Sequence, residues 1–239
     1  MIYEFAKLKI KIEVPYKDFD IFAKDYISKD DNYDLLIEVN KEDVQKELDL
    51  SEEKTFSNEY LQTCAVLRKL SSIFPKYNRL LMHGAVIEYE GNGYMFSADS
   101  GTGKTTHILL WRKFLGDKVK IVNGDKPFLI NQKDYIEVCG SPWCGKENYQ
   151  RNVIVPLKGI CFIERGKENK IRKLTTLEAM HRMFKQIYFP KDSETFSLAM
   201  DVVSGILEKV DIYLLQCDIS KEAVKTSFEM MTKEVMYEN

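Results

Sequence analysis

The stretch from residue 94 to residue 106, Tyr-Met-Phe-Ser-Ala-Asp-Ser-Gly-Thr-Gly-Lys-Thr-Thr, constrains the fold of this chain more than any other. Its first three residues are typical of a buried strand, and the residues from His107 to Trp111 are typical of a helix. The glycines between them let the backbone wrap around phosphate oxygens so that successive N–H groups point at the anion. Strand, glycine loop and helix in this order are the context of a phosphate-binding loop. The sequence therefore predicts a site for nucleotide phosphates in an α/β fold.

The loop and the first helical turn supply the residues of this predicted site. They are Asp99, Ser100, Gly101, Thr102, Gly103, Lys104, Thr105 and Thr106. We expect the Lys104 ammonium to reach the outer phosphates and the Thr105 hydroxyl to ligate magnesium. The usual motif begins with a glycine where this chain has Ala98. A glycine-rich surface turn is the alternative, but it leaves the lysine and the threonines unexplained.

An acidic residue follows the next predicted strand, which runs from Val119 to Val122. The strand continues into Asn-Gly-Asp-Lys-Pro at residues 123 to 127. In phosphoryl-transfer sites, a carboxylate downstream of the phosphate loop holds magnesium, directly or through water. Asp125 is therefore the predicted metal ligand, and an ordinary turn residue is the alternative.

Two further segments carry candidate side chains. His83 lies in a predicted strand from 79 to 88, which forms a hairpin with the strand before the phosphate loop. A lone strand histidine is often a packed, hydrogen-bonded core residue, and this is the alternative reading. The loop from 140 to 147 is rich in turn residues yet carries Trp143, Lys146 and Glu147. Such loops often carry function, although a turn held by one buried tryptophan also fits.

The composition limits the partners and the location of the chain. With 239 residues, 44% of them hydrophobic, the chain can bury a core, and its net charge of −2 does not favour nucleic acid as a partner. No apolar run of membrane-spanning length is present, and the N-terminus carries charge where a signal peptide is apolar. The five cysteines form no Cys-x-x-Cys pair. We therefore expect a soluble, cytoplasmic protein with reduced thiols and no membrane partner.

The remaining pattern predicts a β-rich N-terminal lobe, a mixed sheet and a helical C-terminal portion. We expect residues 1–78, with strands and one helix, to pack on a core of residues 79–239 as one continuous structural domain. The segments 17–33 and 41–57 are predicted to be connections or exposed strands. Strands are expected at 4–14, 34–40, 79–88, 94–96, 119–122, 128–130, 135–138, 156–164, 170–174 and 212–216, and helices at 58–73, 107–111, 176–186, 193–209 and 221–237.

Three motifs resemble those of the HPr kinase/phosphorylase family and its phosphoenolpyruvate-carboxykinase-like relatives. They are His83-Gly84-Ala85-Val86, Ser-Gly-Thr-Gly-Lys-Thr-Thr at 100–106, and Ile-Val-Asn-Gly-Asp at 121–125. The resemblance covers residues 80–165 best. With the Gly-Ser-Pro-Trp segment at 140–143, it is strongest to small serine-kinase-like proteins encoded beside peptide-modification genes.

The resemblance implies a magnesium-dependent kinase that uses ATP, or alternatively GTP, and transfers phosphate to a serine or threonine of a peptide or small protein. Lys104 would hold the outer phosphates, Thr105 and Asp125 the magnesium, and His83 would lie near the γ-phosphate. Lys146 or Glu147 would contact the transferring phosphate or the acceptor. The first acidic position of the family, its general base, is Gly124 here. Either Asp125 serves as both ligand and base, or another carboxylate such as Glu147 takes one role.

Two other functions remain open at this point. A regulatory nucleotide-binding module without catalysis would fit the missing carboxylate at residue 124. A kinase of a serine-like metabolite would fit the same phosphate loop. The sequence does not distinguish ATP from GTP, does not name the acceptor and is compatible with an oligomer.

Overall fold

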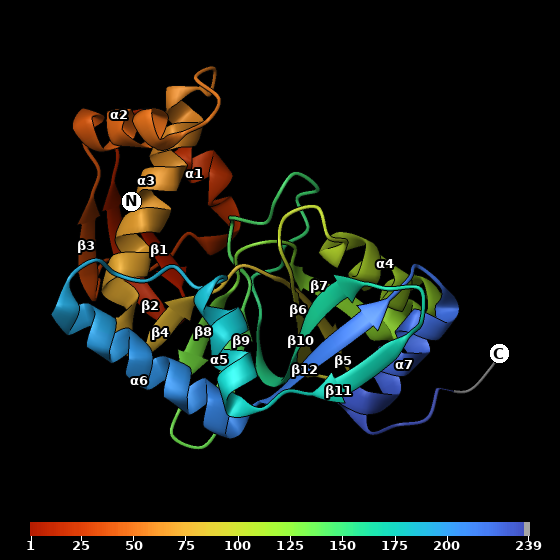
Figure 1. Ribbon diagram of the computed structural model, residues 1–239. Helices are drawn as coiled ribbons and strands as arrows, with labels where there is room; N and C mark the ends of the chain where they lie inside the picture. The colour runs from red at the N-terminus through yellow and green to blue at the C-terminus, as the bar shows by residue number, and fades with distance from the viewer. Residues whose placement is uncertain (237–239) are drawn as a thin grey trace.

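The central strand β10 (Ile154–Arg165) joins two parts of one nine-stranded sheet. Its first residues pair antiparallel with β9 (Ile136–Cys139), and its later residues pair parallel with β6 (Asn92–Ser97) and β12 (Asp211–Cys217). The computed structural model describes residues 1–236, and Figure 1 shows the arrangement of its elements. The predicted α/β class with a mixed sheet is confirmed.

The other strands of this sheet extend on both sides of β10. The order is β4-β8-β9-β10-β6-β5-β7, with β12 paired to β10 and β11 paired to β12. The bounds are β4 (Arg79–Leu81), β5 (Ala85–Tyr89), β7 (Val119–Asn123), β8 (Phe128–Asn131) and β11 (Lys170–Lys173).

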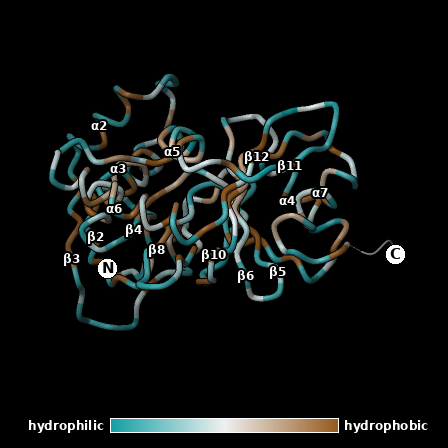
Figure 2. Tube along the Cα trace, turned by 60° about the horizontal axis from the view of Figure 1, so that its bottom comes forward, coloured by the Kyte–Doolittle hydropathy of each residue, from teal (hydrophilic) through white to brown (hydrophobic). Residues whose placement is uncertain are grey.

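Alternate residues of the central strands face two different helical layers. In β10, Ile160 and Phe162 lie in a cluster with α5 (Thr176–Phe184) and α6 (Ser193–Lys209), whereas Cys161 and Ile163 lie in a cluster with α4 (Lys104–Leu115) and α7 (Lys221–Thr232). This is the period-two alternation of a strand that is buried on both faces. Figure 2 shows the resulting hydrophobic segments, in brown, along β5, β10 and β12.

The N-terminal elements form a second, three-stranded sheet with its own helices. The strands β1 (Ile2–Phe5), β2 (Leu8–Glu13) and β3 (Leu35–Glu38) lie in this order. The helices are α1 (Phe19–Phe22), α2 (Lys41–Leu50) and α3 (Asn58–Ile73), and short 3₁₀ turns lie at Lys24–Tyr26 and Phe74–Tyr77. Phe128, Ile130 and Trp143 of the larger part pack into the same cluster as these elements.

Four predicted elements differ from the structure. The strand expected at 4–14 is a hairpin, because Ala6 and Lys7 both have positive φ and form a tight turn between β1 and β2. The segment 41–50 is the helix α2, which a capping box between Asn40 and Asp43 stabilises. The predicted helix 221–237 ends at Thr232, and Tyr237 lies outside the described residues.

The strand expected at 79–88 is interrupted at His83 and Gly84. β4 pairs with β8, whereas β5 pairs with β6 and β7, so the two halves belong to different parts of the sheet. In the gap, the His83 amide donates to the Gln186 carbonyl and the Gly84 amide donates to the Asp125 carbonyl. His83 therefore lies at a break in the strand, and the prediction that it lies inside a strand is wrong.

The helices of residues 1–236 include none with the length and apolar character that crossing a membrane requires.

Candidate active site

The loop between β6 and α4 depends on two glycines. Gly101 has φ of 74° and Gly103 has φ of 126°, values that strain any residue with a side chain. Nothing lies within 4 Å of a Cβ added at either glycine, so the backbone conformation alone requires them. Ala98 is buried and has no positive φ, so its backbone does not require the glycine of the usual motif.

The N-terminus of α4 lacks a side-chain cap. Its N-cap residue is Gly103, whereas side-chain oxygens cap α2, α3, α5, α6 and α7. The first amides of α4 are therefore available to an anion, and the positive end of the helix dipole lies at the same place. This arrangement suits phosphate oxygens.

Lys104 begins α4 and is 8% exposed. Its Nζ donates to the Ala98 carbonyl over 2.9 Å, and this is the only hydrogen bond of the ammonium within residues 1–236. Burial lowers the pKa of Lys104, and the charges of Asp125 and Asp99 partly offset this effect. A buried ammonium with three donors and one partner is well placed to bind a further anion.

His83 and Asp125 form a pair beside this loop. His83 Nε2 lies 3.0 Å from Asp125 Oδ1, and Lys126 Nζ lies 3.1 Å from Asp125 Oδ2. Burial alone would raise the pKa of Asp125, but the hydrogen bond from His83 and the charge of Lys126 outweigh it, and the pKa lies below its ordinary value. Asp125 is therefore a stabilised carboxylate with both oxygens engaged.

The buried Asn123 fixes the turn that carries Asp125. Its side-chain oxygen accepts hydrogen bonds from the amides of Asp125 and Lys126, both at 2.8 Å. Its amide nitrogen donates to the Ser141 carbonyl over 2.9 Å. The turn at the end of β7 is thus joined to the 140–149 segment.

Gly124 is closed on the side where a side chain would project. A Cβ added there would lie 2.6 Å from the Cys144 carbonyl oxygen, and the Gly124 amide donates to the Tyr149 carbonyl over 2.9 Å. Since real Cβ atoms do not come this close to backbone, an acidic residue at position 124 requires the 140–149 segment to move.

Glu147 lies on this segment, on the exposed surface, as does Lys146. Gly145 separates Glu147 from Asp125: a Cβ added at Gly145 would lie 3.4 Å from Asp125 Cβ and 3.6 Å from Glu147 Oε2. Glu147 makes no hydrogen bond or ion pair within the described part of the chain, so it is near the His83–Asp125 pair without contacting it. Trp143 anchors the segment, because its indole donates to the Thr63 carbonyl over 3.0 Å.

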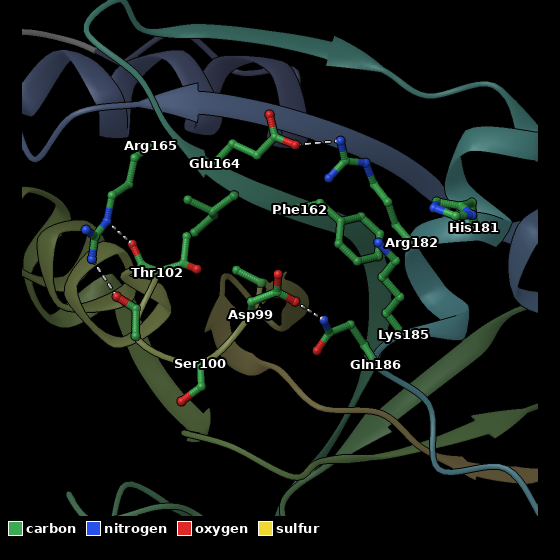
Figure 3. A pocket seen from close by; sticks show the side chains of 13 residues that line it. Asp99, Ser100, Thr102, Phe162, Glu164, Arg165, His181, Arg182, Lys185 and Gln186 are labelled. Atoms are coloured by element: carbon green, nitrogen blue, oxygen red, sulfur yellow. Dashed lines mark hydrogen bonds and ion pairs between the residues drawn. The ribbon is translucent and has the colours of Figure 1, made fainter.

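A cavity of about 620 Å³ opens beside the loop (Figure 3). Asp99, Ser100 and Thr102 line it on one side, and Phe162, Arg182 and Lys185 lie across from them. Arg165 lies at the loop end of the cavity and donates to the carbonyls of Gly101 and Thr102 over 2.6 and 3.3 Å. A second cavity of about 390 Å³ lies on the other side of Arg165, against Thr106 and Leu110.

The predicted metal ligands are Thr105 and Asp125. Among residues 1–236, no three His, Cys, Asp or Glu side chains form a metal cluster. Magnesium often takes only one or two protein ligands, so a magnesium site does not require such a cluster. The Thr105 hydroxyl has no hydrogen-bond partner in the described structure. Because His83 and Lys126 occupy both Asp125 oxygens, Asp125 fits a magnesium ion best through a bridging water.

Three residues of the site were not predicted. Lys126 lies shortly after β7, and Arg165 is the last residue of β10. The sequence predicts both strands, so the position of each residue near a strand end was the available signal. Gln186 bridges Asp99 and His83 from beyond α5, and no sequence pattern connects it with either residue.

Comparison with known proteins gives a distant likeness among solved structures. No protein-family model and no curated protein sequence matches the chain. Among solved structures, the chain is similar to the Hpr(Ser) kinase/phosphatase from Coxiella burnetii, with 8% sequence identity and a TM-score of 0.36 over 64% of this chain and 93% of that chain. This is a distant fold relationship.

Proposed function

We propose that the protein is a magnesium- and ATP-dependent kinase that transfers the γ-phosphate to a serine or threonine hydroxyl of a peptide or small protein. The observation that carries the proposal is the buried Lys104 at the uncapped start of α4. GTP is the alternative nucleotide.

The proposal gives each group one task. The amides of residues 100–106 and Lys104 would hold the β- and γ-phosphates, and His83 would orient the γ-phosphate or the acceptor. Thr105 and Asp125 would hold magnesium, which neutralises charge on the transferring phosphate.

The acceptor hydroxyl also needs a base, and we assign this role to Glu147. Asp125 is a poor base because its two oxygens are hydrogen-bonded and its pKa lies below the ordinary value. Glu147 is exposed, has no such partners and lies across Gly145 from Asp125.

A thermal melt tests nucleotide binding first. With Mg-ATP at about 100 times its dissociation constant, we expect about 2.7 kcal/mol of stabilisation and a rise in Tm of about 5–10 °C. Lys104→Ala should lose this shift, whereas Lys113→Ala, which removes an exposed lysine from the same helix, should keep it. Equal shifts in wild type and Lys104→Ala would contradict the site.

Phosphate transfer to a serine- and threonine-containing peptide library tests the chemistry. Glu147→Gln should slow transfer by about 10²- to 10⁴-fold without changing the Mg-ATP shift. Asp125→Asn should abolish the tightening of ATP by magnesium. Transfer at the wild-type rate by Glu147→Gln would overturn the assignment of the base.

A regulatory nucleotide-binding module is the second candidate, and the closed position at Gly124 favours it. It predicts the same Mg-ATP shift without transfer to any acceptor. A metabolite kinase would instead phosphorylate free serine-like compounds when no peptide is present.

We also propose a cytoplasmic location. All five cysteines are free thiols, which suits a reducing compartment.

A further inference from the structure

Asp99 places a negative charge in the loop that is proposed to hold phosphates. Such a charge repels a bound anion unless a hydrogen-bond partner turns the carboxylate away from the anion. Asp99 Oδ1 accepts a hydrogen bond from Gln186 Nε2 over 3.0 Å, and Figure 3 shows the two side chains pointing toward each other across the cavity.

Gln186 is held rigidly in the turn after α5 and is 7% exposed. The backbone N–H of Gln186 donates to the Met183 carbonyl over 2.9 Å, and the backbone carbonyl of Gln186 accepts from the backbone N–H of His83 over 2.7 Å. The next residue, Ile187, forms an isolated bridge with Met82, which lies between the end of β4 and His83. The backbone therefore fixes where the Gln186 side chain can reach.

The two ends of this side chain serve two different partners. While Nε2 donates to Asp99, Oε1 lies 2.9 Å from Nδ1 of His83. A primary amide offers one donor end and one acceptor end, so Nε2 suits the Asp99 carboxylate and Oε1 suits the His83 Nδ1 when that nitrogen carries a proton. A glutamate would face Asp99 with a second carboxylate, and an apolar side chain would satisfy neither group.

We infer that Gln186 is a positioning residue that ties the phosphate loop, through Asp99, to His83. It turns the Asp99 carboxylate toward α5 and sets the place of the loop relative to the His83–Asp125 pair. In this view Asp99 is an anchor of the loop and not a direct contact of the nucleotide. The consequence for phosphate binding rests on the proposed function, whereas the anchoring of the loop does not.

Hydrogen exchange of amides 98–106 in the ligand-free protein tests the anchor. Gln186→Met and Gln186→Glu should each raise the exchange rates about tenfold or more, because a hydrogen bond to a charged group is lost. The double variant Asp99→Asn/Gln186→Glu should return the rates toward wild type, since the new amide at position 99 donates to the new carboxylate at position 186. If the single variants act only through altered packing, the exchange rates should not return toward wild type in this double variant, in which the amide and the carboxylate have changed places.

A matched control comes from another glutamine–carboxylate pair. Gln132 Nε2 donates to Glu137 Oε2 over 2.8 Å, and Gln132 lies in the turn after β8. Gln132→Glu makes the same change there and should leave exchange in 98–106 unchanged.

Mg-ATP affinity provides the second readout. Gln186→Glu should weaken binding about tenfold, and the double variant should restore it. Unchanged exchange in Gln186→Glu, or no recovery in the double variant, would overturn the inference. If wild type itself binds no Mg-ATP, the proposed function fails, and the exchange experiment still decides whether the anchor exists.

Discussion

Gly124 precedes Asp125, and the Cys144 carbonyl closes the space beside it. Gly124→Ala and Gly124→Asp should therefore each destabilise the protein by about 1–3 kcal/mol, because the side chain forces the 140–149 segment to shift. Urea unfolding followed by circular dichroism measures this. A Gly124→Asp protein of wild-type stability would mean that the segment moves aside freely.

Asp125 should make the stability depend on acid pH. Its folded pKa lies below the ordinary value of 3.8, so its contribution is present above that value and is lost as pH falls through the folded pKa. Wild type should accordingly lose more unfolding free energy than Asp125→Asn as the pH falls from about 4 to about 2. Parallel pH profiles for the two proteins would contradict this.

The sequence predicts that His83, Lys104 and Asp125 belong to one site, and the structure brings these three residues close together. His83 contacts Asp125, and Lys104 lies close enough for the Asp125 charge to affect its pKa. Local motifs made this predictable, because loop, strand end and histidine all lie within one stretch of the chain. Gln186 is 103 residues from His83, and only the folded chain brings the two together.

Among the elements, the hairpin of β5 and β6 was predicted from its glycine-rich turn, and it is present. The turn residues Glu90 and Gly91 have φ of 48° and 78°, the conformation that favours Asn-Gly. Glu90→Asn should therefore stabilise the protein by about 0.5–1 kcal/mol, as measured by the urea midpoint at constant slope. Gly91→Ala is the control and should destabilise it.

Two of the four elements that differ from the prediction, α2 and the strand at 79–88, do so for different reasons. The helix α2 buries only Val44 and Glu47, so its apolar pattern is weak, although Asn40 and Asp43 already form a helix-start signal. The run from 79 to 88 is apolar on both sides of His83, so nothing local marks the break. Pairing with distant strands decides it.

At the scale of the whole molecule, Trp143 connects the two sheets. Its ring packs against Phe5, Phe22 and Phe128, and its indole bonds to α3. We propose that residues 1–78 and 79–239 form one cooperative unit, as the sequence suggested.

Trp111→Phe leaves Trp143 as the only tryptophan, since the chain has two. In this variant, the urea transitions by fluorescence and by far-ultraviolet circular dichroism should coincide. A fluorescence change at lower urea would show that the N-terminal elements separate first.

The contact between position 124 and the Cys144 carbonyl also restricts the order in which mutations can accumulate. An acidic substitution at 124 meets a closed backbone, so it is disfavoured until the 140–149 segment has changed. In the other order, a mutation that moves the 140–149 segment comes first. It removes the packing of the segment on Gly124 and does not yet add a carboxylate. A form with two adjacent carboxylates and an unstrained segment therefore needs at least two substitutions, and the first of them carries a cost. Descendants that keep this segment are expected to keep a single carboxylate at the end of β7.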